Sequence, residues 1–560
     1  MTDEERPGSL RSHRTGRTGA RGRVARFAAR PDAVPLLAGL LLLLVGGQVA
    51  LIHTVPSWAN DEPAHLGYVA ALAAGDLPTI ESDIVDDPDR FPRTAEELRG
   101  RDEEHGDIWT ANHPPLFHLA MVPVWWALSD VNQSGMVITM RLANTLGFAV
   151  WLVLVGALAR QLVPGRPAVA ALAVLVAAAP TLVLRSAFLQ NDGWASASAV
   201  LLLLVSVRML REEVTPQRVA AAVVAGTVAA GTRAQGVLVV ALCAVFLLVV
   251  LARRSGGTAA GWRRALVVAG AVGGVPAAAF GWFFVRNRVL YGDFTAQDAL
   301  LEKFERAPVA TWGQLDQVRG LEQPLTGAAL LVVVGVVLVP AALVRSVRRH
   351  GVRLDAVWIL LTLHAVLTLY SIVTFVLAGG GFHDRYVMQA VPLLATVVAV
   401  GMLEVARWGA PPPSASASAE RRDWWVASAW AAVLLVWLGA TMAWLEHRHV
   451  FSRQEFSPVD GPVPDLLVVL AVAVGAAAVA VMVIRARNVA VGGPAPVRRP
   501  PPPRHPHPLP QRRAHRSGSR PVPAPRSVDD DALGRLVGGQ LVVVDVEEEP
   551  HDHRGGQHHQ

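Results

Sequence analysis

Long apolar runs recur along the chain, and they constrain its fold more than any other feature. A helix needs roughly 20 apolar residues to cross the hydrocarbon core of a bilayer. Backbone groups in lipid must be hydrogen-bonded within the protein, and continuous runs of Ala, Val and Leu lack the alternation of barrel strands. We therefore predict an all-α polytopic membrane protein with about 12 transmembrane helices, near residues 33–55, 141–162, 167–186, 193–210, 217–232, 235–252, 265–285, 325–344, 355–378, 386–406, 424–444 and 463–484.

The composition agrees with a membrane protein. Hydrophobic residues make up 52% of the chain and charged residues only 17%, whereas soluble domains carry about 25% charged residues. The net charge is +6, and the basic residues are overwhelmingly arginines; we attribute them to the positive-inside rule and not to nucleic-acid binding. The single cysteine, Cys243, excludes an intramolecular disulfide and a cysteine-based metal site, and we interpret it as a small core residue.

The arginine distribution predicts the topology. The apolar stretch from Pro114 to Leu128 is short and contains Trp125 and Trp126, so we interpret it as an interfacial helix. The arginine clusters of the later loops then lie in the cytoplasm, as the positive-inside rule requires, and both termini are cytoplasmic. We expect a multi-pass protein of the cell membrane whose unusual polar residues collect on the outer face.

This topology divides the chain into five segments. We expect residues 1–32 to form a basic, disordered cytoplasmic arm, and residues 33–406 to form a transmembrane module with large outer loops at 56–140 and 286–324. A cytoplasmic linker, 407–423, leads to a transmembrane hairpin, 424–484. The tail, 485–560, is rich in Pro, Arg and His, and we expect it to be disordered because it cannot bury a core.

The expected outer loops contain carboxylates, histidines and arginines beside the helix ends. Three of them also have a purely structural interpretation. Asp61 and Asp192 could be helix caps, and Arg233 could be a snorkelling side chain. Together they suit transfer of a group from an anionic lipid, because a carboxylate accepts the acceptor proton and arginines neutralise the leaving phosphate. The candidate residues are Asp61, Glu62, His65, His113, Asp192, Arg233, Arg286, His383, Arg385 and Tyr386.

Several short motifs occur in an order typical of one group of membrane enzymes. The sequence resembles the GT-C superfamily of polytopic glycosyltransferases, especially family-39-like protein mannosyltransferases and aminoarabinose transferases, and within it the DUF2142 type of bacterial membrane protein. The resemblance covers about residues 33–406. It rests on Asp61-Glu62-Pro63-Ala64-His65, Gly75-Asp76-Leu77-Pro78, His113-Pro114-Pro115-Leu116, Asn191-Asp192, Arg286-Asn287 with Tyr291-Gly292-Asp293, and Arg385-Tyr386.

This resemblance implies an inverting transferase that uses a polyprenyl-phosphate sugar and a glycan, lipid or protein acceptor of the cell envelope. It makes Asp61 the catalytic base, Asp192 a second carboxylate of the site, and Arg233 a ligand of the donor phosphate. The other candidates named above would bind substrate or phosphate. Metal dependence varies within the superfamily, so a divalent ion is a possible cofactor, with no ligands assigned.

Two other classes fit the same apolar runs. One is a transporter or flippase of lipid-linked sugars, which should carry polar residues at mid-membrane depth or broken helices in inverted repeats. The predicted spans are nearly free of such residues, His364 being the main exception. The other is a non-catalytic membrane assembly protein, which would tolerate loss of Asp61.

Overall fold

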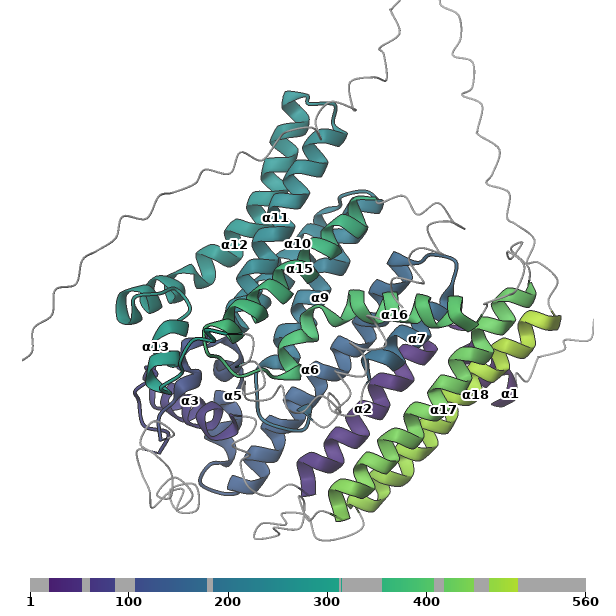
Figure 1. Cartoon of the computed structure of the whole chain (residues 1–560), viewed down its shortest axis with the longest axis horizontal. Coiled ribbons are helices and arrows are strands. Elements are labelled where there is room, and N and C mark those ends of the chain that lie inside the picture. Colours follow the sequence, from purple (N-terminus) through teal and green to yellow (C-terminus); the bar gives the residue numbers. More distant parts are fainter. Residues whose placement is uncertain are drawn as a thin grey trace, which may run out of the picture. The chain divides into compact units, whose positions relative to one another are not determined.

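The structure, a computed structural model, describes residues 20–52, 61–85, 106–178, 185–311, 314, 355–406, 417–447 and 463–491. Helices dominate these residues, and one isolated bridge joins Asp83 to Asp107. In chain order the helices in Figure 1 are α1 (Ala20–Ala29), α2 (Ala33–Ile52), α3 (Glu62–Ala74), η3 (Trp109–Asn112), α5 (Leu116–Leu128), α6 (Gln133–Leu162), α7 (Pro167–Ala177), α9 (Asp192–Arg211), α10 (Pro216–Thr232), α11 (Ala234–Arg254), α12 (Ala259–Tyr291), α13 (Gln297–Lys303), α15 (Ala356–Leu377), η5 (Asp384–Gln389), α16 (Val391–Ala406), α17 (Ala417–His447) and α18 (Val463–Val491).

Eight of the described helices are long and apolar enough to cross a membrane: α2, α6, α9, α11, α12, α15, α17 and α18. The predicted all-α, multi-pass architecture is therefore confirmed. The predicted runs at 167–186, 217–232 and 386–406 correspond to the shorter helices α7, α10 and α16. The predicted span 325–344 lies outside the described residues, so the total of twelve stays a prediction.

The segment boundaries differ at three places from those expected. Residues 20–29 of the basic arm form α1, whose end is held by a 2.7 Å hydrogen bond from Arg485 Nε to the Ala28 carbonyl. Helix α17 begins at Ala417, inside the expected linker, and α18 continues to Val491, inside the expected tail. Residues 492–560 lie outside the described part of the chain.

Helices α6, α7 and α9 lie at the centre of the apolar core. In α9, 83% of the most apolar 18-residue window is buried, whereas the value is only 22% for α12 and 28% for α11. Helix α7 buries every residue from Ala168 to Ala177. Helices α11 and α12 instead expose Val, Leu and Trp side chains, as expected of helices that are apolar all round and face lipid.

The first long loop contains two short helices that position the candidate site. Helix α3 begins directly after Asp61 and ends at Ala74, and the capping residue Gly75 has a φ of 99°, which suits a residue without a Cβ. Helix α5 packs against α3 through the buried Phe117, Met121 and Trp125. Its 13 residues are too few to span a bilayer, which agrees with the expected interfacial placement.

Two glycines allow backbones to approach closely beside the candidate site. A Cβ at Gly193, in the first turn of α9, would lie 2.7 Å from the Asn144 carbonyl oxygen of α6 and 2.6 Å from the Phe148 ring. A Cβ at Gly236, in the first turn of α11, would overlap the Ala229 carbonyl of α10. Real Cβ contacts are not this short, so both turns require glycine.

Candidate active site

A cavity of about 1320 Å³ lies where the ends of α9, α11, α12 and α15 meet the loops. Its volume exceeds the roughly 300–1,000 Å³ of a usual small-molecule pocket. One wall is apolar and comes from α11, α12 and α15, with Leu238, Val245, Phe280, Phe284, Ile372 and Phe375. The other wall is polar and includes Asp61, His65, His113, Asp192, Arg233 and Arg385.

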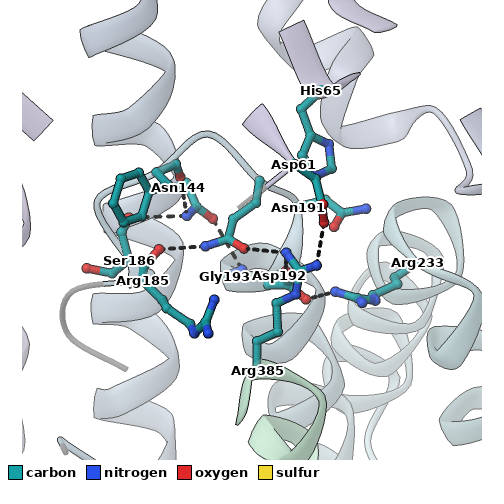
Figure 2. A network of polar contacts seen from close by, with 12 residues as sticks. Asp61, His65, Asn144, Arg185, Ser186, Asn191, Asp192, Gly193, Arg233 and Arg385 are labelled. Carbon is teal, nitrogen blue, oxygen red and sulfur yellow. Dashed lines mark hydrogen bonds and ion pairs between the residues drawn. The ribbon is translucent and has the colours of Figure 1, made fainter. Parts of the chain in front are cut away.

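Two carboxylates and two guanidinium groups form a continuous chain of ion pairs on the polar wall. Arg385 pairs with Asp61 through Nη2, and its Nη1 lies 3.8 Å from Asp192 Oδ2. Asp192 pairs in turn with Arg233. Figure 2 shows Arg385 between the two carboxylates, with Arg233 on the far side of Asp192. Arg385 also donates a 3.2 Å hydrogen bond from Nη1 to Gln190 Oε1.

Four separate parts of the fold position these charged side chains. Asp61 precedes α3 in the left-handed conformation (φ 60°, ψ 18°), which non-glycine residues rarely adopt and which is often found at functional sites. Asp192 is in the first turn of α9, Arg233 separates α10 from α11, and Arg385 is in η5. Asn191 donates a 2.9 Å hydrogen bond to the Thr232 carbonyl, which joins the second and third of these elements.

The ion pairs determine which groups carry charge. Burial disfavours the ionised form of Asp61, but the charge and hydrogen bond of Arg385 outweigh it and hold the pKa of this carboxyl well below its usual range. Burial likewise disfavours the charge on Arg385, yet Asp61 and Tyr386 raise its pKa. Burial and Arg385 lower the pKa of Arg233 to about 10, so it remains a cation at neutral pH. Asp61 is thus ionised, and its carboxylate is held in an ion pair with Arg385.

The cavity carries more positive than negative charge. Arg185 and Arg306 also line it, so the lining contains four arginines and the two carboxylates of Asp61 and Asp192. Arginine binds phosphate oxygens in bidentate geometry. The surplus of two positive charges suits an anionic ligand such as a phosphate ester.

The aromatic ring of Tyr386 lies beside both inner arginines. The Arg233 and Arg385 guanidinium carbons lie 5.6 and 5.5 Å from its centroid, within the range of cation–π contacts. His383 lines the cavity and meets the same ring edge-on at 5.5 Å. The segment from Gly379 to Tyr386 therefore returns to the site.

Glu62 and Arg286 do not line the cavity. Glu62 is buried in a bidentate pair with Arg141 of α6, with two N–O distances of 2.9 Å, and it also accepts a 2.6 Å hydrogen bond from the Leu189 amide. Arg286 donates a 2.7 Å hydrogen bond to the Pro78 carbonyl. Both side chains hold the first long loop in place, so their expected role as substrate ligands has no support from these contacts.

Several residues of the site belong to none of the motifs that identified the candidate residues in the sequence. Gln190 contacts Arg385, and Arg185 and Arg306 line the cavity. Arg185 and Arg306 lie on the expected outer side of the membrane, where the positive-inside rule does not account for arginine. Their convergence on one cavity depends on the packing of the loops. His118 follows the His113 motif on α5 and contacts His65.

The residues present do not form a recognisable metal site. Among the residues that the structure describes, there is no group of three or more His, Cys, Asp or Glu side chains that could hold an ion. The Asp61 carboxylate is paired with Arg385, and His65 Nδ1 is occupied by His118.

Comparisons with known proteins agree with the membrane fold. Residues 90–299 match the model of a family described as "Predicted membrane protein (DUF2142)". The predicted resemblance to this type is thus confirmed over that segment. No curated protein matches the sequence.

Similar solved structures include ArnT from Cupriavidus metallidurans bound to undecaprenyl phosphate. It is 16% identical, with a TM-score of 0.43 over 84% of this chain and 78% of that chain. A second is the oligosaccharyltransferase AglB from Archaeoglobus fulgidus in complex with an inhibitory peptide and a dolichol-phosphate. It is 12% identical, with a TM-score of 0.40 over 82% of this chain and 56% of that chain. The chain therefore covers little more than half of that oligosaccharyltransferase.

Proposed function

We propose that this protein is a membrane glycosyltransferase that moves a sugar from a polyprenyl-phosphate donor to a cell-envelope acceptor on the outer face. One observation carries the proposal. The ion-pair chain of Asp61, Arg385, Asp192 and Arg233 lies in the same large cavity as an apolar wall made by three helices. A lipid-linked phosphate has the two chemical halves that such a cavity would bind.

The donor lies with its lipid chain along the apolar wall and its phosphate at the arginines. Each buried CH₂ group contributes about 0.8 kcal/mol, so α11, α12 and α15 hold the tail without polar contacts. Arg233 and Arg385 bind the phosphate oxygens, and the surplus positive charge of the cavity stabilises the leaving group as its charge increases. Asp192 keeps both arginines in place through its two carboxylate oxygens.

The chemical step uses Asp61 as the general base. The acceptor hydroxyl gives its proton to the Asp61 carboxylate while its oxygen forms a bond to the anomeric carbon. The bond from that carbon to the phosphate oxygen breaks, and its electron pair leaves with polyprenyl phosphate. Attack opposite the leaving group inverts the configuration of the sugar.

Donor binding activates this base. Without donor, the carboxylate is paired with Arg385 and is a weak proton acceptor. The donor phosphate competes for the Arg385 guanidinium, and as Arg385 turns to it, burial raises the proton affinity of Asp61. Donor therefore binds before the acceptor is deprotonated, which protects the site from proton uptake when it is empty.

Replacement of the base tests the proposal. In membranes supplied with a radiolabelled polyprenyl-phosphate sugar, Asp61→Asn should reduce formation of the labelled product by about 10²-fold or more. Asp76→Asn is a matched control, since Asp76 is exposed on the same loop and does not line the cavity. Wild-type transfer by Asp61→Asn would disprove the base assignment. Movement of label across the membrane without a new glycosidic bond would instead indicate a flippase.

A further inference from the structure

Two histidine rings form a hydrogen-bonded pair directly behind Asp61. His65 Nδ1 lies 2.9 Å from His118 Nε2. The ring centroids are 5.2 Å apart and the planes differ by 17°. The centroid separation exceeds the N–N distance by about two ring radii, so the two nitrogens lie on the line that joins the centroids. The rings therefore lie edge to edge in nearly one plane. The contact is an in-line N–H···N hydrogen bond and not a stack.

The surroundings hold His118 firmly. Its side chain is fully buried, and it stacks on Tyr68 with centroids 4.0 Å apart. Phe117 meets it edge-on at 5.4 Å. Tyr68 is itself fixed by a 2.9 Å hydrogen bond from its hydroxyl to the His113 carbonyl. The orientation of the His118 ring is therefore set by packing, independently of any ligand.

The position of the protons follows from the remaining nitrogen of His118. His118 Nδ1 is buried and has no hydrogen-bond partner within the described part of the chain. A buried N–H without an acceptor is rarer and costs more than a lone pair without a donor. His118 Nδ1 therefore carries the lone pair. His118 Nε2 carries the proton and donates a hydrogen bond to His65 Nδ1.

This arrangement determines what His65 offers to the cavity. Because its Nδ1 accepts the hydrogen bond from His118, the proton of a neutral His65 is on Nε2. His65 lines the cavity, and Nε2 makes no hydrogen bond with the residues that the structure describes. The charged and titratable groups that face the pair are Asp61, Arg233, Arg385 and His113. Burial lowers the pKa of His65 to about 3, so the ring is neutral at physiological pH.

We propose that His118 is a positioning residue that fixes the Nε2–H tautomer of His65, so that His65 donates a hydrogen bond to a phosphate oxygen of the donor. This inference rests on the proposed function. Arg233 and Arg385 supply the charge that attracts the phosphate, whereas His65 adds a directed neutral donor on the Asp61 side. A neutral donor orients the phosphate without weakening the proton affinity of Asp61, which a second cation beside it would do.

The tautomer is tested by ¹⁵N NMR of the full-length protein labelled at histidine. Protonated and unprotonated ring nitrogens differ widely in chemical shift, and spectra of His65→Gln and His118→Gln assign the two rings. We expect Nε2–H and unprotonated Nδ1 in both. Nδ1–H in either ring would overturn the inference. This readout needs no turnover, so its failure is distinct from a failure of the proposed glycosyltransferase activity.

Binding tests the consequence. His118→Phe keeps the stack on Tyr68 but removes the donor, whereas His118→Gln retains an N–H near the position of Nε2. We expect His118→Phe and His65→Leu to weaken binding of undecaprenyl phosphate about tenfold, the loss of roughly one hydrogen bond. His118→Gln and His65→Gln should stay within about twofold. Binding of undecaprenol, which lacks the phosphate, should not change.

Three results would contradict the inference. They are an unchanged affinity of His118→Phe for undecaprenyl phosphate, an equal loss for undecaprenol, and an equal loss in His118→Gln. The first would mean that the tautomer is irrelevant to binding. The other two would mean that packing, not the proton position, is affected.

Discussion

Asp61 and Glu62 are neighbours in the chain, but their carboxylates lie in separate environments. Asp61 lines the cavity and pairs with Arg385, and 26% of its side chain is exposed. Glu62 is 1% exposed and pairs with Arg141 of α6. One acidic dipeptide thus provides a side chain that lines the cavity and the anchor that holds it, because the first turn of α3 directs the two side chains to different sides.

The anchor should matter for stability. Glu62→Gln leaves the Arg141 guanidinium buried without its countercharge, and breaking a buried pair in this way costs about 3–5 kcal/mol. We expect a clearly lower midpoint of thermal unfolding in detergent. Asp61→Asn should lower the midpoint less, because Arg385 keeps its contacts with Asp192 and Gln190. If Glu62→Gln is as stable as the wild type, the anchoring role is wrong.

Arg385 should control the acid limb of the pH profile. In the donor-free protein Arg385 holds the pKa of Asp61 well below its usual value of 3.8, so Asp61 is ionised at every pH used for assay. Arg385→Gln removes the main influence that opposes the effect of burial on Asp61, so the pKa of this carboxyl should be higher in the variant than in the wild type. The residual kcat/KM of the variant should therefore fall at a higher pH than that of the wild type as the solution is acidified. If kcat/KM of the variant and of the wild type fall at the same acidic pH, the Asp61–Arg385 ion pair does not set the pKa of Asp61.

His65 should act as a neutral group. The ratio of undecaprenyl phosphate affinities between wild type and His65→Gln should stay constant between roughly pH 5 and 8, because burial keeps the His65 pKa at about 3. Protonation of the ligand phosphate affects both proteins equally, so it cancels in this ratio. A ratio that increases steadily on acidification would show that His65 binds as a cation.

The close approach at Gly193 should be required for the site. Gly193→Ala places a Cβ 2.6 Å from Phe148 and 2.7 Å from Asn144, so the α9 start that carries Asp192 must move. We expect a loss of about 1–3 kcal/mol in stability and weaker donor binding. Gly270→Ala on α12 is the control, since its Cβ would meet nothing within 4 Å; it should be neutral or slightly stabilising. Equal behaviour of the two variants would contradict this prediction.

The expected topology can be tested with single cysteines. Cys243 is buried, so the wild type should give little background with an impermeant thiol reagent. Asp76→Cys, on the expected outer side, should react in intact cells, and Arg254→Cys, at the expected cytoplasmic end of α11, only after lysis. Both positions are exposed in the structure. The opposite labelling pattern would reverse the orientation.

Local patterns in the sequence were sufficient for the helical membrane fold. A membrane helix forms because about 20 apolar residues transfer favourably to lipid and bond their backbone groups within the helix. Both effects act within a few turns of the chain, so a local pattern reveals them. For this reason α2, α9, α11 and α15 lie close to the predicted ranges. The same reasoning placed Asp61, Asp192, Arg233 and Arg385 near helix ends, because charged groups leave the apolar runs there.

The partners of these side chains depend on contacts between distant segments. Asp61 and Glu62 have the same charge and are adjacent, so no local property separates the one that lines the cavity from the one paired with Arg141. His118 follows a motif without being part of it, and its role arises from the in-plane contact with His65. The apolar runs thus dictate a bundle of membrane helices. The close packing at Gly193 and Gly236, together with the return of η5, brings four remote charges into one chain of ion pairs, because only the packed backbone sets their distances.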